Sequence, residues 1–69
     1  LLVMKNRIKV ERAELDMTQA DLADKIGVSR QSINAIEKGK FVPSAVLALK
    51  IARLFKKPVE DIFSLEDQD

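Results

Sequence analysis

The 69-residue sequence contains no cysteine, histidine, tryptophan or tyrosine, and only two glycines and two prolines. Without cysteine there is no disulfide framework to suggest secretion, and without cysteine and histidine the usual structural zinc sites are excluded. Histidine-based catalytic pairs and glycine-rich phosphate loops are missing as well. We therefore expect no enzymatic activity, no catalytic residues, no metal and no cofactor.

Long hydrophobic runs are also missing. No apolar stretch approaches the roughly 20 residues of a membrane-spanning helix, and the apolar residues 1–4 are too few for a signal peptide. We expect a cytoplasmic protein that does not contact membranes. A chain of this length forms one domain, residues 1–69, which leaves little room for a small-molecule site.

The small size of the domain points to a second copy. A chain this short buries only about 60% of the surface that it exposes when unfolded, so its core is small. Disulfides and metals are the other usual supplements to such a core, and both are excluded above. We therefore expect a homodimer.

The charged residues are unevenly distributed along the chain. Residues 1–57 hold all 12 Lys and Arg but only six of the 11 acidic residues, a net charge of +6, and residues 58–69 hold the other five acids. A basic body with an acidic tail at residues 66–69 suits a protein that meets phosphate groups on one face. An ordinary solvated surface would explain the charges equally well.

Apolar spacing and capping residues predict five helices, over residues 6–14, 19–26, 30–37, 45–55 and 59–61. Thr18, Ser29 and Ser44 precede three of these helices, where a hydroxyl can accept hydrogen bonds from free N–H groups. Asp21 lies where it would complete a capping box with Thr18. Residues 62–65 could form a strand that pairs with residues 3–5. The predicted fold class is all-α, with five helices and room for a small two-stranded terminal β-sheet.

The same spacing predicts which side chains form the core. Apolar residues three or four apart lie on one face of a helix. The side chains expected to point inward are Ile8, Leu15, Leu22, Ala23, Ile26, Ile33, Ile36, Leu47, Ala48, Ile51, Ala52 and Phe55.

Residues 19–38 match the spacing of a helix-turn-helix motif, in which the second helix enters the major groove of DNA. Counting from Gln19, the fifth position needs a small residue where the helices touch and holds Ala23, and the ninth needs a turn residue and holds Gly27. Five further positions must be apolar to join the two helices. They are Leu22, Ile26, Val28, Ile33 and Ile36.

The motif and its flanks resemble the Xre family, which comprises phage repressor and Cro proteins and their bacterial and archaeal relatives. The matching residues are Arg12, residues 18–23, residues 27–31, Ile33, residues 36–39, Pro43, Ser44 and residues 58–63. The resemblance is greatest to very short dimeric members, which add a small terminal sheet to five helices. It implies a compact repressor-like DNA-binding domain that acts as a transcriptional regulator.

The first exposed side chains of the second motif helix would reach base edges, which here are those of Arg30, Gln31 and Asn34. Arg can bind guanine through two hydrogen bonds, and Gln or Asn can do the same for adenine. Ala35 would offer only apolar contact, for example to a thymine methyl group.

Other polar residues are expected to contact DNA phosphates. The start of the first motif helix suits a phosphate, and the resemblance implies the same backbone-positioning role for Thr18 and Gln19. The complete expected set is Thr18, Gln19, Ser29, Lys38, Lys40 and Ser44. Capping alone would also explain Thr18, Ser29 and Ser44, and one hydroxyl can serve both roles.

Arg12 and Glu37 match a pair that, by resemblance to the family, forms a buried or partly buried salt bridge between the first helix and the recognition helix. We expect this pair to be structural. Loss of one partner would leave a desolvated charge in the fold.

The homodimer interface is expected in the apolar C-terminal part of the chain. The candidates are Leu54, Val59, Ile62, Phe63 and Leu65. The alternative is that all of them belong to the core of a single chain. The leading functional hypothesis is a regulator, most simply a repressor, that binds an inverted-repeat operator in double-stranded DNA as a homodimer. A protein-interaction module of the same fold, such as an antitoxin, is the alternative.

Overall fold

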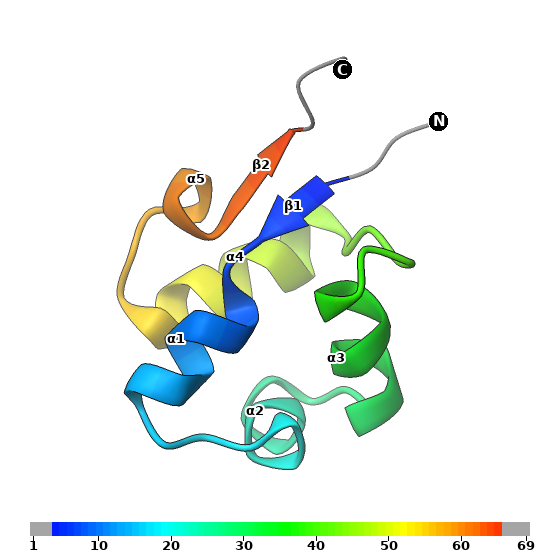
Figure 1. Cartoon of the computed structure of the whole chain (residues 1–69), viewed down its shortest axis with the longest axis vertical. Helices are drawn as coiled ribbons and strands as arrows, with labels where there is room; N and C mark the ends of the chain where they lie inside the picture. Colours follow the sequence, from blue (N-terminus) through cyan, green and yellow to red (C-terminus); the bar gives the residue numbers. More distant parts are fainter. Residues whose placement is uncertain (1–3, 66–69) are drawn as a thin grey trace.

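The computed structural model describes residues 4–65. In this part of the chain five helices surround one core. A two-stranded antiparallel sheet pairs the first described residues with the last (Figure 1). The elements are β1 Met4–Asn6, α1 Ile8–Glu14, α2 Gln19–Ile26, α3 Arg30–Glu37, α4 Ala45–Phe55, α5 Val59–Ile62 and β2 Phe63–Leu65. The mostly α-helical class and the terminal sheet that the sequence predicted are both confirmed. Between residues 4 and 65, no helix combines the length and apolarity needed to cross a membrane.

Three of the helices begin at the caps that the sequence predicted. Thr18 and Asp21 form a capping box, in which the Thr18 hydroxyl accepts from the Asp21 N–H and the Asp21 carboxylate accepts from the Thr18 N–H, each at 3.0 Å. The backbone hydrogen bond from Thr18 favours the charged carboxylate and lowers the pKa of Asp21. Ser29 and Ser44 accept from N–H groups three residues later in the same way.

Gly27 ends α2 and turns the chain into α3. Its φ of +77° lies in the left-handed region, where a residue with a Cβ is strained. A Cβ at this position would meet no other atom within 4 Å. The glycine is therefore needed for its backbone conformation and not for space.

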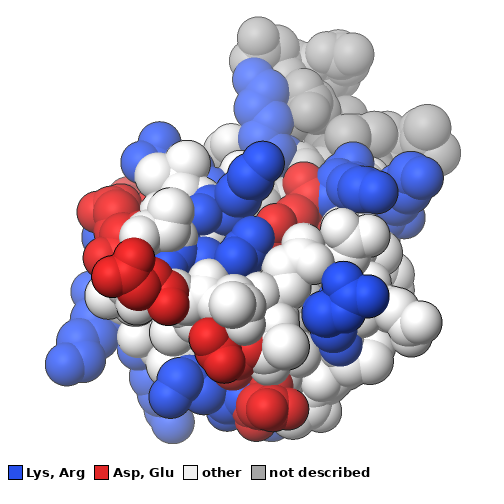
Figure 2. Space-filling view, turned by 60° about the horizontal axis from the view of Figure 1, so that its bottom comes forward, with Lys and Arg blue, Asp and Glu red and all other residues white. Residues whose placement is uncertain are grey.

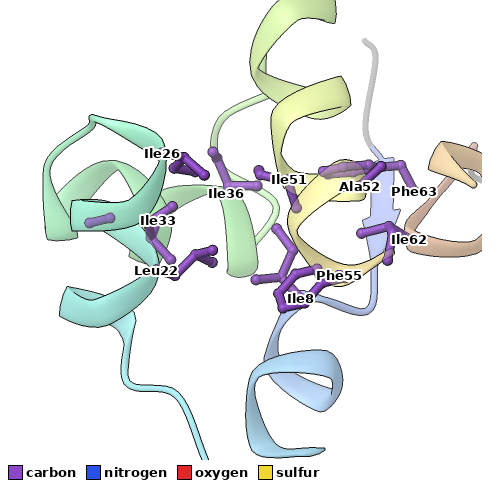
Figure 3. Packing of buried hydrophobic residues seen from close by; sticks show 11 residues of the cluster. Ile8, Leu22, Ile26, Ile33, Ile36, Ile51, Ala52, Phe55, Ile62 and Phe63 are labelled. Carbon is purple, nitrogen blue, oxygen red and sulfur yellow. The ribbon is translucent and has the colours of Figure 1, made fainter. Parts of the chain in front are cut away.

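The core is built from side chains of all five helices (Figure 3). In this view Leu22, Ile33 and Ile36 of α2 and α3 point toward Ile8 of α1 and Ile51 of α4. The buried apolar residues are Ile8, Leu22, Ala23, Ile26, Ile33, Ile36, Ile51, Ala52, Phe55, Ile62 and Phe63. Leu47 and Ala48, expected in the core, are partly buried and pack against it. Burying a large aliphatic side chain stabilises a fold by roughly 1.5–3 kcal/mol, so this cluster holds α2 and α3 on the rest of the domain.

Leu15 does not point inward as the sequence predicted, because its side chain is 53% exposed. Helix α1 ends at Glu14, and Asp16 then takes a left-handed φ of +51° that turns the chain away. Met17 packs against the core after this turn. The helix therefore ends one residue before Leu15, so helical spacing does not predict the direction of its side chain.

The terminal sheet pairs Met4 with Leu65, Lys5 with Ser64 and Asn6 with Phe63. Val3, the expected first residue of the pairing, lies outside the described residues. Asn6 was predicted to begin the first helix but belongs to β1. Its carboxamide oxygen accepts from the N–H of Ile8 and its nitrogen donates to the carbonyl of Ile36, so it links the start of α1 to the end of α3.

Candidate nucleic-acid interface

Helices α2 and α3 form the helix-turn-helix, with α3 at the right edge of the molecule in Figure 1. Ala23 is 2% exposed where the two helices touch, as the motif requires of a small residue. The N–H groups of Gly27 and Val28 both donate to the carbonyl of Ala23, at 2.9 and 3.0 Å. These bonds close the end of α2 and fix the direction in which α3 leaves it.

The core residues of α3 decide which side of this helix faces solvent. Ile33 and Ile36 are buried, and with 3.6 residues per turn the opposite side carries Gln31, Ala35 and Lys38. Arg30 and Gln31 are exposed in the first turn, and Asn34 is half-buried. The three residues predicted to contact bases therefore lie on the part of α3 that faces solvent, away from its buried isoleucines.

Gln19 of α2 holds two side chains of α3 by hydrogen bonds. Its side-chain nitrogen donates to the Asn34 carboxamide oxygen at 3.3 Å and to a Glu37 carboxylate oxygen at 3.2 Å. The sequence placed Gln19 at the start of α2 as a phosphate contact, but its contacts to α3 could not be read from the spacing. Asn34 therefore reaches solvent with its orientation already constrained by Gln19.

Arg12 and Glu37 form the salt bridge that the resemblance implied. Arg12 Nε lies 2.6 Å and Nη2 lies 3.0 Å from the two carboxylate oxygens of Glu37, and both side chains are largely buried, at 13% and 7% exposure. Arg12 Nη1 also donates to the carbonyl of Met17. The hydrogen bond to Glu37 raises the pKa of Arg12. One guanidinium therefore joins α1, the segment before α2 and the end of α3.

The salt bridge also shapes the charge of the α3 surface. Glu37 is the only acidic residue between positions 29 and 44, and Arg12 neutralises it. Arg30, Lys38 and Lys40 are exposed in the same stretch. Figure 2 shows acidic side chains at the left, at the bottom and in the upper centre of its face, whereas the right-hand edge is uncharged or basic. The exposed side of α3 and the following loop is therefore positive.

The hydroxyl groups predicted to contact phosphate already have partners within the fold. Thr18, Ser29 and Ser44 are exposed and accept the capping hydrogen bonds described above. Capping is thus their role in the free protein, and phosphate contact by any of them stays a prediction.

The residues predicted for the dimer interface separate into two groups. Ile62 and Phe63 are 1% and 6% exposed, so they belong to the core of one chain and the expectation that they contact a second copy is corrected. They are buried because α5 and β2 fold back on α4 and β1. Leu54 and Val59 are partly buried, and Leu65 is exposed.

The sequence prediction did not single out five exposed apolar residues, of which Val10 lies on α1 at 46% exposure. Val46 and Leu49 lie on the outer side of α4, at 66% and 58% exposure, and Phe41 and Val42 lie in the loop before α4, at 49% and 41%. A signal for the first pair existed, because positions 46 and 49 are three apart and off the core face of the helix. For the loop residues no periodic signal exists.

Comparison with known proteins places this geometry among DNA-binding regulators. A helix-turn-helix family model matches residues 8–62. An uncharacterized HTH-type transcriptional regulator of Methanocaldococcus jannaschii is 58% identical over 66 residues, which cover 96% of this chain and 100% of that protein. The uncharacterized HTH-type transcriptional regulator YgzD of Bacillus subtilis is 47% identical over 66 residues, with coverage of 96% and 100%.

Solved structures show the same fold. A protein from Bacteroides fragilis has a TM-score of 0.78 at 33% identity, over 88% of this chain and 98% of its own. The restriction-modification controller protein C.AhdI of Aeromonas hydrophila has a TM-score of 0.73 at 25% identity, over 80% and 83% of the two chains.

Proposed function

The chain belongs to the helix-turn-helix family of the Xre type, and from this membership we propose that it represses transcription by binding an inverted-repeat operator as a homodimer. Its relatives are named HTH-type transcriptional regulators, which supports a DNA-binding regulator and not an enzyme. Repression is the simplest sign of regulation, because a protein that occupies an operator overlapping a promoter excludes RNA polymerase from it.

The observation that carries the proposal is the exposed side of α3. Arg30 and Gln31 project from its first turn, where a helix that enters the major groove meets base edges. A guanidinium can form two hydrogen bonds to guanine, and a carboxamide can form two to adenine, each worth about 1–3 kcal/mol of discrimination. Asn34, held by Gln19, is the third candidate for base contact.

Phosphate contacts would position this helix in the groove. Lys38 and Lys40 are exposed at the end of α3 and in the loop that follows, and each can neutralise one phosphate. The free N–H groups at the start of α2, beside Thr18 and Gln19, suit a phosphate on the other side of the groove. Such contacts carry no sequence information, so their loss weakens binding to all sequences alike.

A second copy would double the number of bases that are read. One copy measures 32 × 23 × 21 Å and carries a single α3, so it can reach only one face of one half-site. Two copies related by a two-fold axis can read two half-sites about 34 Å apart. The apolar side chains that remain exposed or half-buried on α4, α5 and β2 are candidates for the contact between them. They include Val46, Leu49, Leu54, Val59 and Leu65.

Selection from a pool of random duplex DNA at two salt concentrations tests the proposal. Retained sequences should share an inverted repeat with half-sites about one helical turn apart, and their binding should weaken steeply as salt rises. Sedimentation of the complex should give two chains per duplex. Retention without sequence preference near physiological salt would contradict the proposal and favour a protein-interaction module of the same fold.

A further inference from the structure

A shallow hollow of about 360 Å³ lies beside the predicted base-reading residues of α3. Its five lining residues are all uncharged: Ser29, Gln31, Ser32, Ala35 and Phe41. Four of them come from α3 and its cap, and Phe41 comes from the loop between α3 and α4, drawn in light green in Figure 1. Phe41 is 49% exposed, so about half of its ring is free to contact another molecule.

Two polar side chains that line this hollow are already hydrogen-bonded to each other, so the hollow is largely apolar. The hydroxyl oxygens of Ser29 and Ser32 lie 3.0 Å apart and share a hydrogen bond, and the Ser29 hydroxyl also accepts from the N–H of Ser32. These two hydrogen bonds use the hydroxyl hydrogen of one serine and the oxygen of Ser29 within the protein. The remaining lining residues are Gln31, Ala35 and Phe41, and the methyl group of Ala35 with the ring of Phe41 favours an apolar group as occupant.

The position of the hollow limits what that group can be. Gln31 and Ala35 lie one helical turn apart on the side of α3 that faces away from the core. If this side enters the major groove, the hollow meets base edges there. Phosphate groups would find no cation among its lining residues. On a base-pair edge in the major groove, the apolar group is the C5 methyl of thymine.

We propose that Phe41 and Ala35 form a binding site for a C5 methyl group on a pyrimidine, supplied by thymine in the operator half-site. The site rests on the proposed function, and it adds a residue outside the recognition helix to those that determine base preference. Ala35 alone offers a single methyl group on an open helix surface. The Phe41 ring adds a wall to that surface, so that the thymine methyl loses more contact with water when it binds.

The test removes only this methyl group from DNA. In the operator selected as described above, each thymine of both half-sites is replaced in turn by deoxyuridine. Burial of one methyl group corresponds to about a fourfold change in Kd for each half-site. We expect one thymine per half-site to show this loss, and the Phe41→Ala variant to show a smaller loss at the same thymine, because Ala35 is still present. Val42→Ala is the matched control, because Val42 is an exposed neighbour in the same loop that does not line the hollow.

A second experiment with 5-methylcytosine distinguishes the effect of the methyl group from the effect of the rest of the base pair. At the position found with uracil, a 5-methylcytosine–guanine pair should bind more tightly than a cytosine–guanine pair by the same factor, and Phe41→Ala should reduce that difference too. Methyl sensitivity that is undiminished in Phe41→Ala, or equal binding of thymine and uracil at every position, would overturn the inference. Neither result would affect the selection of an operator, whereas failure of the proposed function would leave no preferred operator at all.

Discussion

Lys57 Nζ lies 2.8 Å from one carboxylate oxygen of Glu11 and 2.9 Å from the other, although the two residues are 46 positions apart. The Glu11 residue is 3% exposed, and the lysine side chain is 39% exposed. Arg7 Nε lies 3.8 Å from the same carboxylate. The pair ties α1 to the turn that leads into α5, and it gives a buried acid its nearest cationic partner.

This pair predicts a loss of stability at alkaline pH. The hydrogen bond to Glu11 raises the pKa of Lys57 above its ordinary value of 10.5, so the stabilisation is complete below that value and is lost as pH rises through the raised pKa. We expect Lys57→Met to have a lower urea midpoint than the parent protein at neutral pH, and the difference to shrink as the pH rises through the raised pKa of Lys57. Lys9→Met, on an exposed position of α1, is the control. A difference between Lys57→Met and the parent that is constant with pH would instead indicate lost packing.

The Arg12–Glu37 salt bridge predicts a stability change that is distinct from a binding change. Arg12→Met leaves the Glu37 carboxylate largely buried without its main partner, so we expect a loss of about 3–5 kcal/mol in the free energy of unfolding. The double variant Arg12→Met/Glu37→Leu should recover much of this loss, because both charges are then absent. Urea denaturation of the two single variants and the double variant measures the coupling. Coupling near zero would mean that the pair contributes little to the fold.

Lys56 predicts a stabilising substitution. It ends α4 with a φ of +58°, a left-handed conformation that costs a residue with a Cβ roughly 1–2 kcal/mol. We expect Lys56→Gly to raise the free energy of unfolding by roughly 1 kcal/mol. Lys50→Gly is the matched control, since it places the same change inside α4 and should lower stability by about 1 kcal/mol. Equal effects of the two variants would contradict the assigned strain.

The predicted roles of Arg30 and Lys40 give different responses in DNA binding. Arg30→Ala should relax the preference at one base-pair position, because a guanidinium in the first turn of α3 would read a base edge. Lys40→Ala should weaken binding to every sequence alike and lower the slope of log K against log salt by about one. Titrations of the selected operator and its single-base variants at several salt concentrations separate the two effects. Identical behaviour of both variants would show that the assignment of base and phosphate contacts is wrong.

Local sequence signals predicted the features that depend on one or two helical turns. The Thr18–Asp21 capping box, the caps at Ser29 and Ser44 and the left-handed Gly27 all involve residues within three positions of one another. A hydroxyl three residues before a free N–H reaches it in almost any helix, so the fold need not be known. The core faces of α2 and α3 follow from helical spacing for the same reason.

Local signals failed where a residue lies at the end of an element. Leu15 continues the spacing of α1 but falls beyond its last residue, and Asn6 was assigned to α1 because helix propensity does not show the pairing of β1 with β2. Lys56 takes the left-handed conformation for which glycine is the usual signal. In each case the conformation of the residue depends on the direction that the chain takes beyond the helix.

The existence of the five helices, the caps at Thr18, Ser29 and Ser44, the helix-turn-helix and the exposed residues of α3 could be predicted from the sequence, because they follow from contacts within a few residues. Four features became visible only in the folded chain: Glu11 pairs with Lys57, Gln19 holds Asn34, Ile62 and Phe63 are core residues, and Phe41 borders α3. These contacts depend on the angles at which helices pack and on where loops return to the surface. Many side chains acting together set those angles, and no short pattern of residues encodes them.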